Sequence, residues 1–305
     1  MRHGLAKTRR EIRKHGAYYV LLLPMIAYFI IWHYIPMYGV TIAFKDYRIN
    51  DGILGSPWVG LDNFRDLFGA YAFQKVMRNT LLISLYRLVF GFPAPVLFAL
   101  FLNEIRLGAF KRTVQTISYL PHFISWVVLG SIVTDLLSPS TGVVNTLLGL
   151  LGAEPVYFMI QRSMFRSILV ATDIWAGVGW SSIIYLSALT SVNVELYEAA
   201  YMEGANRLQG MRYITLPAIL PVVSIVFILG MGGIMNAGFD QVYNMYNERV
   251  YEVADILDTY VYRLGLKEMK YSFASAVGLF KNVVGLMALL LTNFVVRRVG
   301  DSALL

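Results

Sequence analysis

A polar stretch between two long apolar ones indicates how this chain is organised: residues 195–217 read ELYEAAYMEGANRLQGMRYITLP. Its first part, Leu196 to Met202, contains mostly good helix formers, and glutamates near its start favour the amino end of a helix. Gly204 then permits a sharp change of direction. Pro217 is compatible with the first turn of a second helix. The pattern predicts a short helix that lies across a membrane face and joins two spanning helices.

Six apolar stretches are long enough to cross a bilayer as helices, which takes about 20 residues each. They are residues 17–44, 79–102, 113–138, 167–194, 213–239 and 271–296. The composition, 57% hydrophobic and 15% charged, excludes a soluble enzyme, because soluble domains carry about 25% charged residues. We therefore expect an all-α polytopic membrane protein with six transmembrane helices. A basic tail over residues 1–16 would precede a single transmembrane domain over residues 17–305.

The positive charges indicate on which side of the membrane each loop lies. With a cytoplasmic N-terminus, the inner segments hold 13 Lys and Arg against 6 Asp and Glu, whereas the outer segments hold 11 of each sign. The whole net charge of +7 then lies on the inner side, as the positive-inside rule predicts. We expect both termini in the cytoplasm, and we attribute the basic character to orientation and not to nucleic-acid binding.

The three outer segments differ in character. Residues 45–78 are polar and rich in turn residues, and they end in a short amphipathic stretch. Residues 139–166 contain an apolar run too short to span, which predicts an interfacial helix. Residues 240–270 alternate aromatic and acidic side chains, which fits either a docking surface or a solvated loop with tyrosines at the membrane interface.

The polar stretch also has a recognisable spacing: Glu-Ala-Ala, three residues, Gly, nine residues, Ile, one residue, Leu-Pro. Every position matches, and the residues are Glu198, Ala199, Ala200, Gly204, Ile214, Leu216 and Pro217. The stretch resembles the EAA loop of ABC importer permeases, in which it forms a cytoplasmic coupling helix that docks into a cleft of the ATPase subunit. The resemblance implies the type I ABC importer permease fold, and it assigns ATPase coupling to these seven residues and to Glu203.

Further motifs resemble one branch of that family, over about residues 15–300. They are NTLL at 79–82, FPAP at 92–95, NE at 103–104, YLPHFIS at 119–125 and FDQ at 239–241. They are similar to permeases for oligosaccharides and polysaccharide fragments, the group of the alginate, rhamnogalacturonan and LplB-type transporters. The resemblance implies a multi-pass protein of the bacterial cytoplasmic membrane, with a second homologous permease and an extracellular or periplasmic solute-binding protein as partners. The basic tail favours the MalF-like half of that heterodimer.

ATP chemistry is expected on another chain, because the sequence has no G-x-x-x-x-G-K-[ST] motif. The resemblance implies two copies of an ABC ATPase that bind ATP and Mg. On this chain we expect no cofactor, no metal site and no catalytic residue, so it is not itself an enzyme. The implied function is one half of a heterodimeric pathway that imports oligosaccharides by alternating access.

Four ionisable residues fall inside the predicted spans: Arg87, Asp135, Asp173 and Lys281. Charges at membrane depth need partners, water or a ligand. One interpretation is structural, with Arg87 or Lys281 paired to Asp173. The other is that some of these residues line the sugar cavity, and the two interpretations are compatible.

Helical periodicity selects candidates for the substrate pathway. Asp173, Gly177 and Trp180 share a face at i, i+4 and i+7, so a carboxylate for sugar hydroxyls and an indole for stacking lie together. If the two cations face the cavity unpaired, an acidic sugar such as a uronate is the expected substrate. The candidate set is Tyr86, Arg87, Asp173, Gly177, Trp180 and Lys281.

Two other function classes remain as alternatives. A secondary sugar transporter acting without an ATPase explains the intramembrane charges but not the polar motif, and such folds normally show an internal repeat, which we do not find. A membrane-embedded enzyme requires clustered catalytic residues, whereas the charges here are dispersed. His33 and His122 have no second ligand at metal-binding spacing and are expected to be packing residues.

Overall fold

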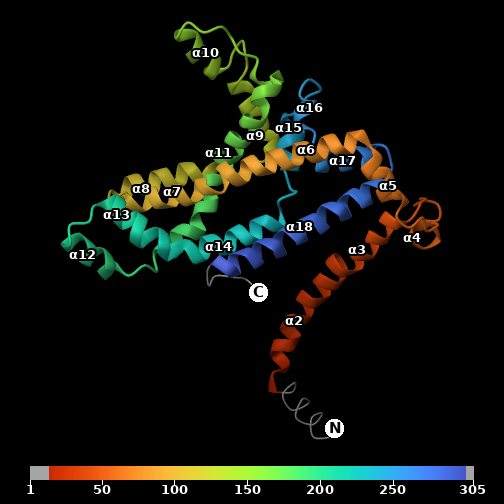
Figure 1. Cartoon of the computed structure of the whole chain (residues 1–305), viewed down its shortest axis with the longest axis horizontal. Helices are drawn as coiled ribbons and strands as arrows, with labels where there is room; N and C mark the ends of the chain where they lie inside the picture. Colours follow the sequence, from red (N-terminus) through yellow and green to blue (C-terminus); the bar gives the residue numbers. More distant parts are fainter. Residues whose placement is uncertain (1–13, 300–305) are drawn as a thin grey trace.

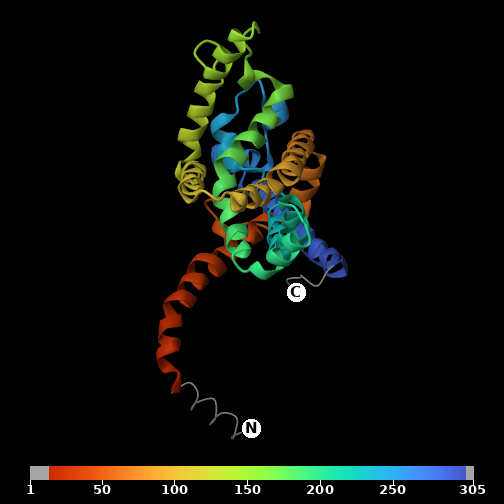
Figure 2. The same cartoon turned by 90° about the vertical axis from the view of Figure 1, so that its left-hand side faces the viewer.

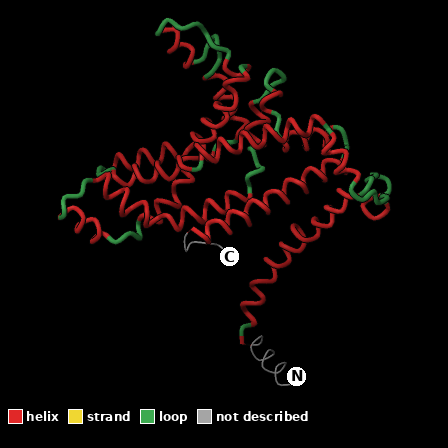
Figure 3. Tube along the Cα trace, viewed as in Figure 1, coloured by secondary structure: helices red, strands yellow, loops and turns green. Residues whose placement is uncertain are grey.

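The computed structural model describes residues 14–299, so most of the expected basic tail and the end of the chain lie outside the described residues. The described part consists of helices and loops (Figures 1 and 3), and one antiparallel bridge joins Lys45 to Trp58. No strand forms within residues 14–299. The prediction of an all-α protein is confirmed.

Within the described residues, five continuous helices are long and apolar enough to cross a membrane. They are Gly16–Phe44, Tyr71–Glu104, Arg162–Leu189, Arg207–Gly232 and Tyr271–Arg298. Short 3-10 and π turns, labelled η, interrupt three of them. Their elements are α2 (Gly16–Phe29), η1 (Ile30–Tyr34), α3 (Ile35–Met37), η2 (Tyr38–Phe44), α6 (Tyr71–Tyr86), η3 (Arg87–Gly91), α7 (Pro93–Glu104), α11 (Arg162–Leu189), α13 (Arg207–Gly210), η6 (Met211–Thr215), α14 (Leu216–Gly232) and α18 (Tyr271–Val299).

The third predicted span, residues 113–138, is not one straight helix. It consists of α8 (Gly108–Tyr119), η4 (Leu120–Phe123) and α9 (Trp126–Leu136), with a bend of 110° between the two helical parts. Ile124 and Ser125 have extended backbones at the break. Pro121 lies just before them and has no N–H to give to a continuing helix. The number of spans is therefore six if this bent pair counts as one span.

Helix ends also differ from the limits of the apolar stretches. The second span begins at Tyr71, and not at residue 79, because its outer turns bury Phe73 and Val76 against neighbouring helices. The fourth ends at Leu189, and the fifth runs from Arg207 to Gly232. Apolar composition marks the lipid-facing length of a helix, but amphipathic turns beyond it stay helical when they pack on the protein.

Short elements connect the spans. They are α4 (Gly52–Gly55), α5 (Asp62–Gly69), α10 (Val143–Leu150), η5 (Phe158–Ile160), α12 (Val194–Met202), α15 (Phe239–Met245), α16 (Tyr251–Ala254), α17 (Leu257–Tyr262) and η7 (Arg263–Lys267). In Figure 1, α12 and α13 lie at the left edge, whereas α4 and α5 lie at the right and α10 and α16 at the top. The loop between α11 and α13 therefore lies at the end of the bundle opposite α4 and α5.

Glycines allow helices to cross at very short distances. A β-carbon at Gly179 of α11 would lie 2.2 Å from the Ser118 carbonyl oxygen of α8. A β-carbon at Gly285 of α18 would lie 2.4 Å from the Gly232 carbonyl oxygen of α14. Glycines inside the spans thus allow close helix packing at these two crossings, while Gly177 faces open space.

The first part of the first span stands apart from the other helices, whereas its end is packed. None of the most apolar window of this span is buried, and Figures 1 and 2 both show α2 leaving the rest of the chain. Its exposed side chains include Leu21, Ile31 and Trp32. At the end of the span, η2 contacts α18 and Ala43 is fully buried. The exposed apolar part requires lipid or another protein around it.

Candidate functional site

The polar stretch forms a helix, α12, that protrudes from the bundle. The Asn193 side chain caps it by accepting a hydrogen bond from the Glu195 backbone N–H at 3.0 Å. Gly204 follows the helix with φ +87, a left-handed conformation that other residues rarely adopt. The next helix begins at Arg207, where Asn206 and Gln209 form a capping box. The predicted helix, turn and second helix are therefore all present.

Two contacts fasten α12 to the start of the fifth span. The Tyr197 and Thr215 hydroxyls are hydrogen-bonded at 2.7 Å, although 18 positions separate them. Gly210 packs under the ring of Tyr201, where a β-carbon would lie 3.4 Å from the phenol oxygen. Because Thr215 is itself buried, α12 is held by the bundle and is not a free loop.

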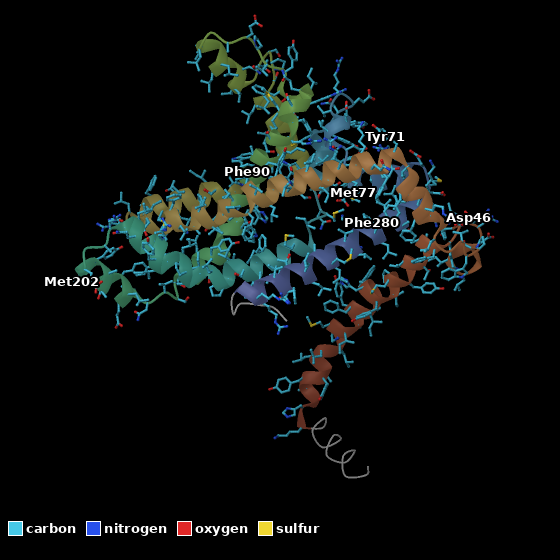
Figure 4. The ribbon with its side chains drawn as sticks, in the orientation of Figure 1. Asp46, Tyr71, Met77, Phe90, Met202 and Phe280 are labelled. Atoms are coloured by element: carbon cyan, nitrogen blue, oxygen red, sulfur yellow. The ribbon has the colours of Figure 1, made fainter. Side chains whose placement is uncertain are left out.

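The motif residues divide into an exposed and an inner set. Glu198, Ala199, Glu203, Gly204 and Pro217 are exposed, whereas Ala200, Ile214 and Leu216 are half-buried. Sequence reasoning missed Met202, which is 89% exposed and lies at the far edge of the molecule in Figure 4. A flexible apolar side chain next to exposed motif residues suits contact with a partner protein. The signal in the sequence that could have identified Met202 was its position directly before Glu203.

A pocket of about 500 Å³, here called the central pocket, lies between the break in the third span, α11 and α15. Asp173 and Gly177 line it, as predicted from their shared face. Its other polar side chains come from His122, Ser125, Asp240 and Asn244, which the search for paired charges did not select. The pocket therefore combines carboxylates, an amide, a hydroxyl and an imidazole with apolar walls, as sites for small polar ligands commonly do.

Trp180 lies one turn further along α11 and is already stacked. Its ring and that of His122 are 4.6 Å apart with an interplanar angle of 4°, and Phe123 packs edge-on at 5.3 Å. One indole face is thus covered in this state. The expectation that His122 is a packing residue is correct for this stack, but the same side chain also lines the central pocket.

Arg87 is paired with Asp173, which was one of the two interpretations of the charges in the membrane. The closest guanidinium and carboxylate atoms are 3.6 Å apart, and the same guanidinium donates to the Gln241 side chain. Gln241 in turn donates to the Leu169 carbonyl at 2.8 Å. Since Asp173 also lines the central pocket, the structural and the pathway interpretations hold together for this residue.

Lys281 has a different partner from the one predicted. It pairs with Asp258 of α17 and not with Asp173. Tyr86 is also elsewhere: with Phe90, Arg162 and other residues it lines a separate pocket of about 720 Å³. The structure therefore does not gather the whole predicted set around one cavity.

Residues 240–270 are neither a free docking surface nor a solvated loop along their whole length. Ile256 and Leu257 are fully buried, and Asn79 of the second span donates to the Asp255 carbonyl at 3.0 Å. The Arg263 and Asp255 side chains pair at 2.7 Å. Desolvation opposes this cation, but the hydrogen bond and charge of Asp255 outweigh it and raise the pKa of Arg263. This segment is therefore part of the packed bundle.

Within residues 14–299, no three His, Asp or Glu side chains are grouped so that they could hold a metal ion. The apolar helices define a membrane protein with several spans, and a capped helix, α12, protrudes from its bundle. The family model described as "Binding-protein-dependent transport system inner membrane component" matches residues 91–301, and the chain belongs to this family. Its members are permease subunits of ABC transporters and are not enzymes themselves.

Individual relatives match over almost the whole chain. The polygalacturonan/rhamnogalacturonan transport system permease protein YteP of Bacillus subtilis (strain 168) is 44% identical, over 94% of this chain and 89% of its own. Protein LplB of the same organism is 44% identical, over 94% and 90%. A chain of a bacterial ABC transporter that imports the acidic polysaccharide alginate shares 41% identity and a TM-score of 0.89, covering 96% of this chain and 99% of that one. The expected type I ABC importer permease fold is thereby confirmed.

Proposed function

We propose that this chain is the permease half of an ATP-driven importer whose substrate is an oligosaccharide. The central pocket carries this proposal, because one of the helices that line it, α11, continues directly into the coupling loop. The relatives named above transport, by their names, polygalacturonan, rhamnogalacturonan or alginate. Family membership also favours this function over a secondary transporter that acts without an ATPase.

The pocket suits the hydroxyl groups of a sugar. Asp173 and Asp240 accept hydrogen bonds, Asn244 donates and accepts, and the Ser125 hydroxyl does both. An acidic sugar was expected if Arg87 and Lys281 faced the cavity unpaired. This condition is not met within this chain, because each of the two cations pairs with a carboxylate. A preference for uronates is therefore supported by the names of the relatives and not by unpaired cations in the pocket.

The partners we propose are a second homologous permease, two ABC ATPases that bind ATP and Mg, and a solute-binding protein. An alginate transporter of similar structure is described in complex with a periplasmic protein that holds an alginate pentasaccharide. The exposed first span supports a permease partner, since its apolar surface requires cover. We assign this chain to the MalF-like half, with the domain limits given above and both termini in the cytoplasm.

In the proposed mechanism, the ATPases move the coupling helix. This movement opens the central pocket alternately to the outer side of the membrane and to the cytoplasm. Glu198, Ala199, Glu203 and Gly204 would contact the ATPase cleft because they are exposed around the end of α12. Ile214 and Leu216, with Ala200, would pass the movement inward because they are half-buried. Pro217 lies in the first turn of α14, the part of the fifth span that would move with them.

The test is sugar uptake by the complete complex in proteoliposomes, with oligogalacturonides as the probe. Uptake should require ATP and the solute-binding protein. Asp173→Asn should lower it severalfold, because one lining carboxylate loses its charge and releases Arg87. Asp135→Asn is the matched control, since Asp135 is an exposed intramembrane carboxylate that does not line the pocket. Uptake without ATP, or equal losses in both variants, would contradict the proposal.

A further inference from the structure

Five aromatic side chains form a continuous row beside the central pocket. Phe239, Tyr243 and Tyr246 follow one another at i, i+4 and i+7 along and just after α15, with ring centroids 5.3 and 6.1 Å apart. Tyr251 continues the row at 4.6 Å from Tyr246. Tyr262 of α17 packs against the other end, 5.1 Å from Tyr243. We call these five residues the aromatic row.

The rings in this row are not core residues. Tyr251 is 37% exposed and the other four are half-buried, so each ring keeps part of its surface accessible. Four of the five residues carry a phenol hydroxyl, which can donate and accept hydrogen bonds beside apolar ring surface. Burial, followed by the neighbouring Tyr251 hydroxyl, raises the pKa of Tyr246, so this phenol stays protonated at neutral pH.

The row and the central pocket share one helix. Asp240 and Asn244 of α15 line the pocket, and they alternate along the chain with Phe239 and Tyr243 of the row. One step along a helix turns the side chain by about 100°, so the aromatic face adjoins the polar face. The row continues from there to Tyr251, beyond the end of α15. The row thus begins on the helix that also lines the pocket and leads away from that helix.

We propose that the aromatic row is a set of outer subsites that holds the sugar units of an oligosaccharide not yet inside the central pocket. This inference rests on the proposed function. Sugar rings expose C–H faces that stack on aromatic rings and hydroxyls that bond to phenols, and the row presents both at intervals similar to those between successive rings of a sugar chain.

The charges around the row fit an acidic chain at one end. The Lys267 ammonium lies 5.5 Å from the centre of the Tyr262 ring and makes no ion pair within residues 14–299. Arg263, in contrast, is held by Asp255 and only flanks Tyr251, at 6.0 Å. Lys267 is therefore the cation of this row that a uronate carboxylate would meet without displacing a protein carboxylate.

The experiment compares chain lengths in the complete complex reconstituted in proteoliposomes. The probes are a digalacturonate and a hexagalacturonate, and the measured quantity is the ratio of their uptake rates at low concentration. Tyr251→Ala should lower the ratio of hexamer to dimer uptake by about tenfold, because the longer chain loses one stacking contact. Tyr251→Phe keeps the ring and should keep most of the ratio. Tyr157→Ala is the matched control, since Tyr157 is an exposed tyrosine outside the row.

Several outcomes would overturn the inference. An unchanged ratio in an assembled Tyr251→Ala complex would do so, as would an equal fall for Tyr157→Ala or for Tyr251→Phe. Tyr246→Ala is a second test, and it should lower the same uptake ratio. If this variant prevents assembly of the complex, the result for Tyr251→Ala decides, because Tyr251 is exposed. If the wild-type complex imports neither probe nor a neutral oligosaccharide, the proposed function itself fails. This result can be told apart from failure of the present inference, in which the probes are imported but the hexamer-to-dimer uptake ratio is the same in Tyr251→Ala and the wild type.

Discussion

Replacing Gly179 by alanine tests the crossing of α8 and α11, which positions one wall of the central pocket. The new β-carbon would lie 2.2 Å from the Ser118 carbonyl oxygen and 2.4 Å from its carbonyl carbon. Both atoms belong to backbone, so no side chain can rotate away and the helices must separate. His122 lies four positions after Ser118, and the shift would also disturb its stack on Trp180.

The size of the effect follows from two opposing contributions. Overpacking at a rigid contact costs about 1–3 kcal/mol, and the backbone clash places Gly179→Ala at the upper end. Alanine regains up to about 1 kcal/mol in helix propensity. A net loss of about 2 kcal/mol should lower the melting temperature by about 4–8 °C for a protein of this size.

Gly177→Ala is a matched control two positions away on the same helix. No atom lies within 4 Å of its would-be β-carbon, but the residue lines the central pocket. The control should therefore keep or raise the melting temperature while weakening sugar uptake, whereas Gly179→Ala should lower the melting temperature. Thermal unfolding of the purified complex, followed together with uptake, separates the two. Equal melting temperatures for both variants would refute the argument that the crossing is tight.

Three further variants probe other contacts. Tyr197→Phe removes the hydrogen bond to Thr215, which is worth about 1 kcal/mol, and should lower the amount of sugar imported per ATP hydrolysed. Tyr213→Phe is the control at an exposed tyrosine and should leave that amount unchanged. A similar drop in the control would count against α12 as the rigid link. Gly204→Ala forces a left-handed backbone that costs about 1–2 kcal/mol and should reduce co-purification of the ATPase; normal recovery would show that the turn is not needed for docking. Lys281→Met should destabilise the complex more than the double variant Lys281→Met, Asp258→Leu, because the single change leaves a carboxylate unpaired; an additive result from a double-mutant cycle would argue against the ion pair.

Local patterns in the sequence predicted the elements whose causes are themselves local. The helix, turn and second helix of this loop were predictable because the signals for them, the helix formers after Glu195, Gly204 and Pro217, each act on their own neighbours in the chain. The spans were predictable because a lipid environment requires long apolar runs. The break at Ile124 was not, since a proline three residues earlier is compatible with a continuous membrane helix when neighbours satisfy the backbone.

The partners of charged residues were predicted less well, because pairing depends on tertiary structure. Helix depth alone placed Asp173 as a partner for either cation, and this was correct for Arg87. It was wrong for Lys281, because Asp258 lies in a segment that hydropathy assigns to a loop. That segment folds back into helices whose buried apolar residues, such as Ile256 and Leu257, are too few in sequence to resemble a span.

In the proposed mechanism, the connectivity of the chain lets a movement of α12 reach the pocket without a long relay. The α11 helix carries Asp173 and Gly177, and it ends only a few residues before α12 begins. On the other side, α12 is tied through Tyr197 to Thr215, where the span leading to Asp240 and its pocket wall begins. Two walls of the pocket are thus extensions of the two arms that hold the coupling helix.

The third wall of the pocket is tied to both of the others. It consists of η4 and the start of α9, on either side of the extended backbone at Ile124 and Ser125. The helix that leads into η4, α8, is held against α11 at Gly179, whereas α9 packs on α15 through Gly130 and Asn244. The α11 and α15 walls are themselves joined, because the Gln241 side chain donates to the Leu169 carbonyl. The break between η4 and α9 therefore connects two walls that also contact each other, so the three walls of the pocket form one continuous set of contacts.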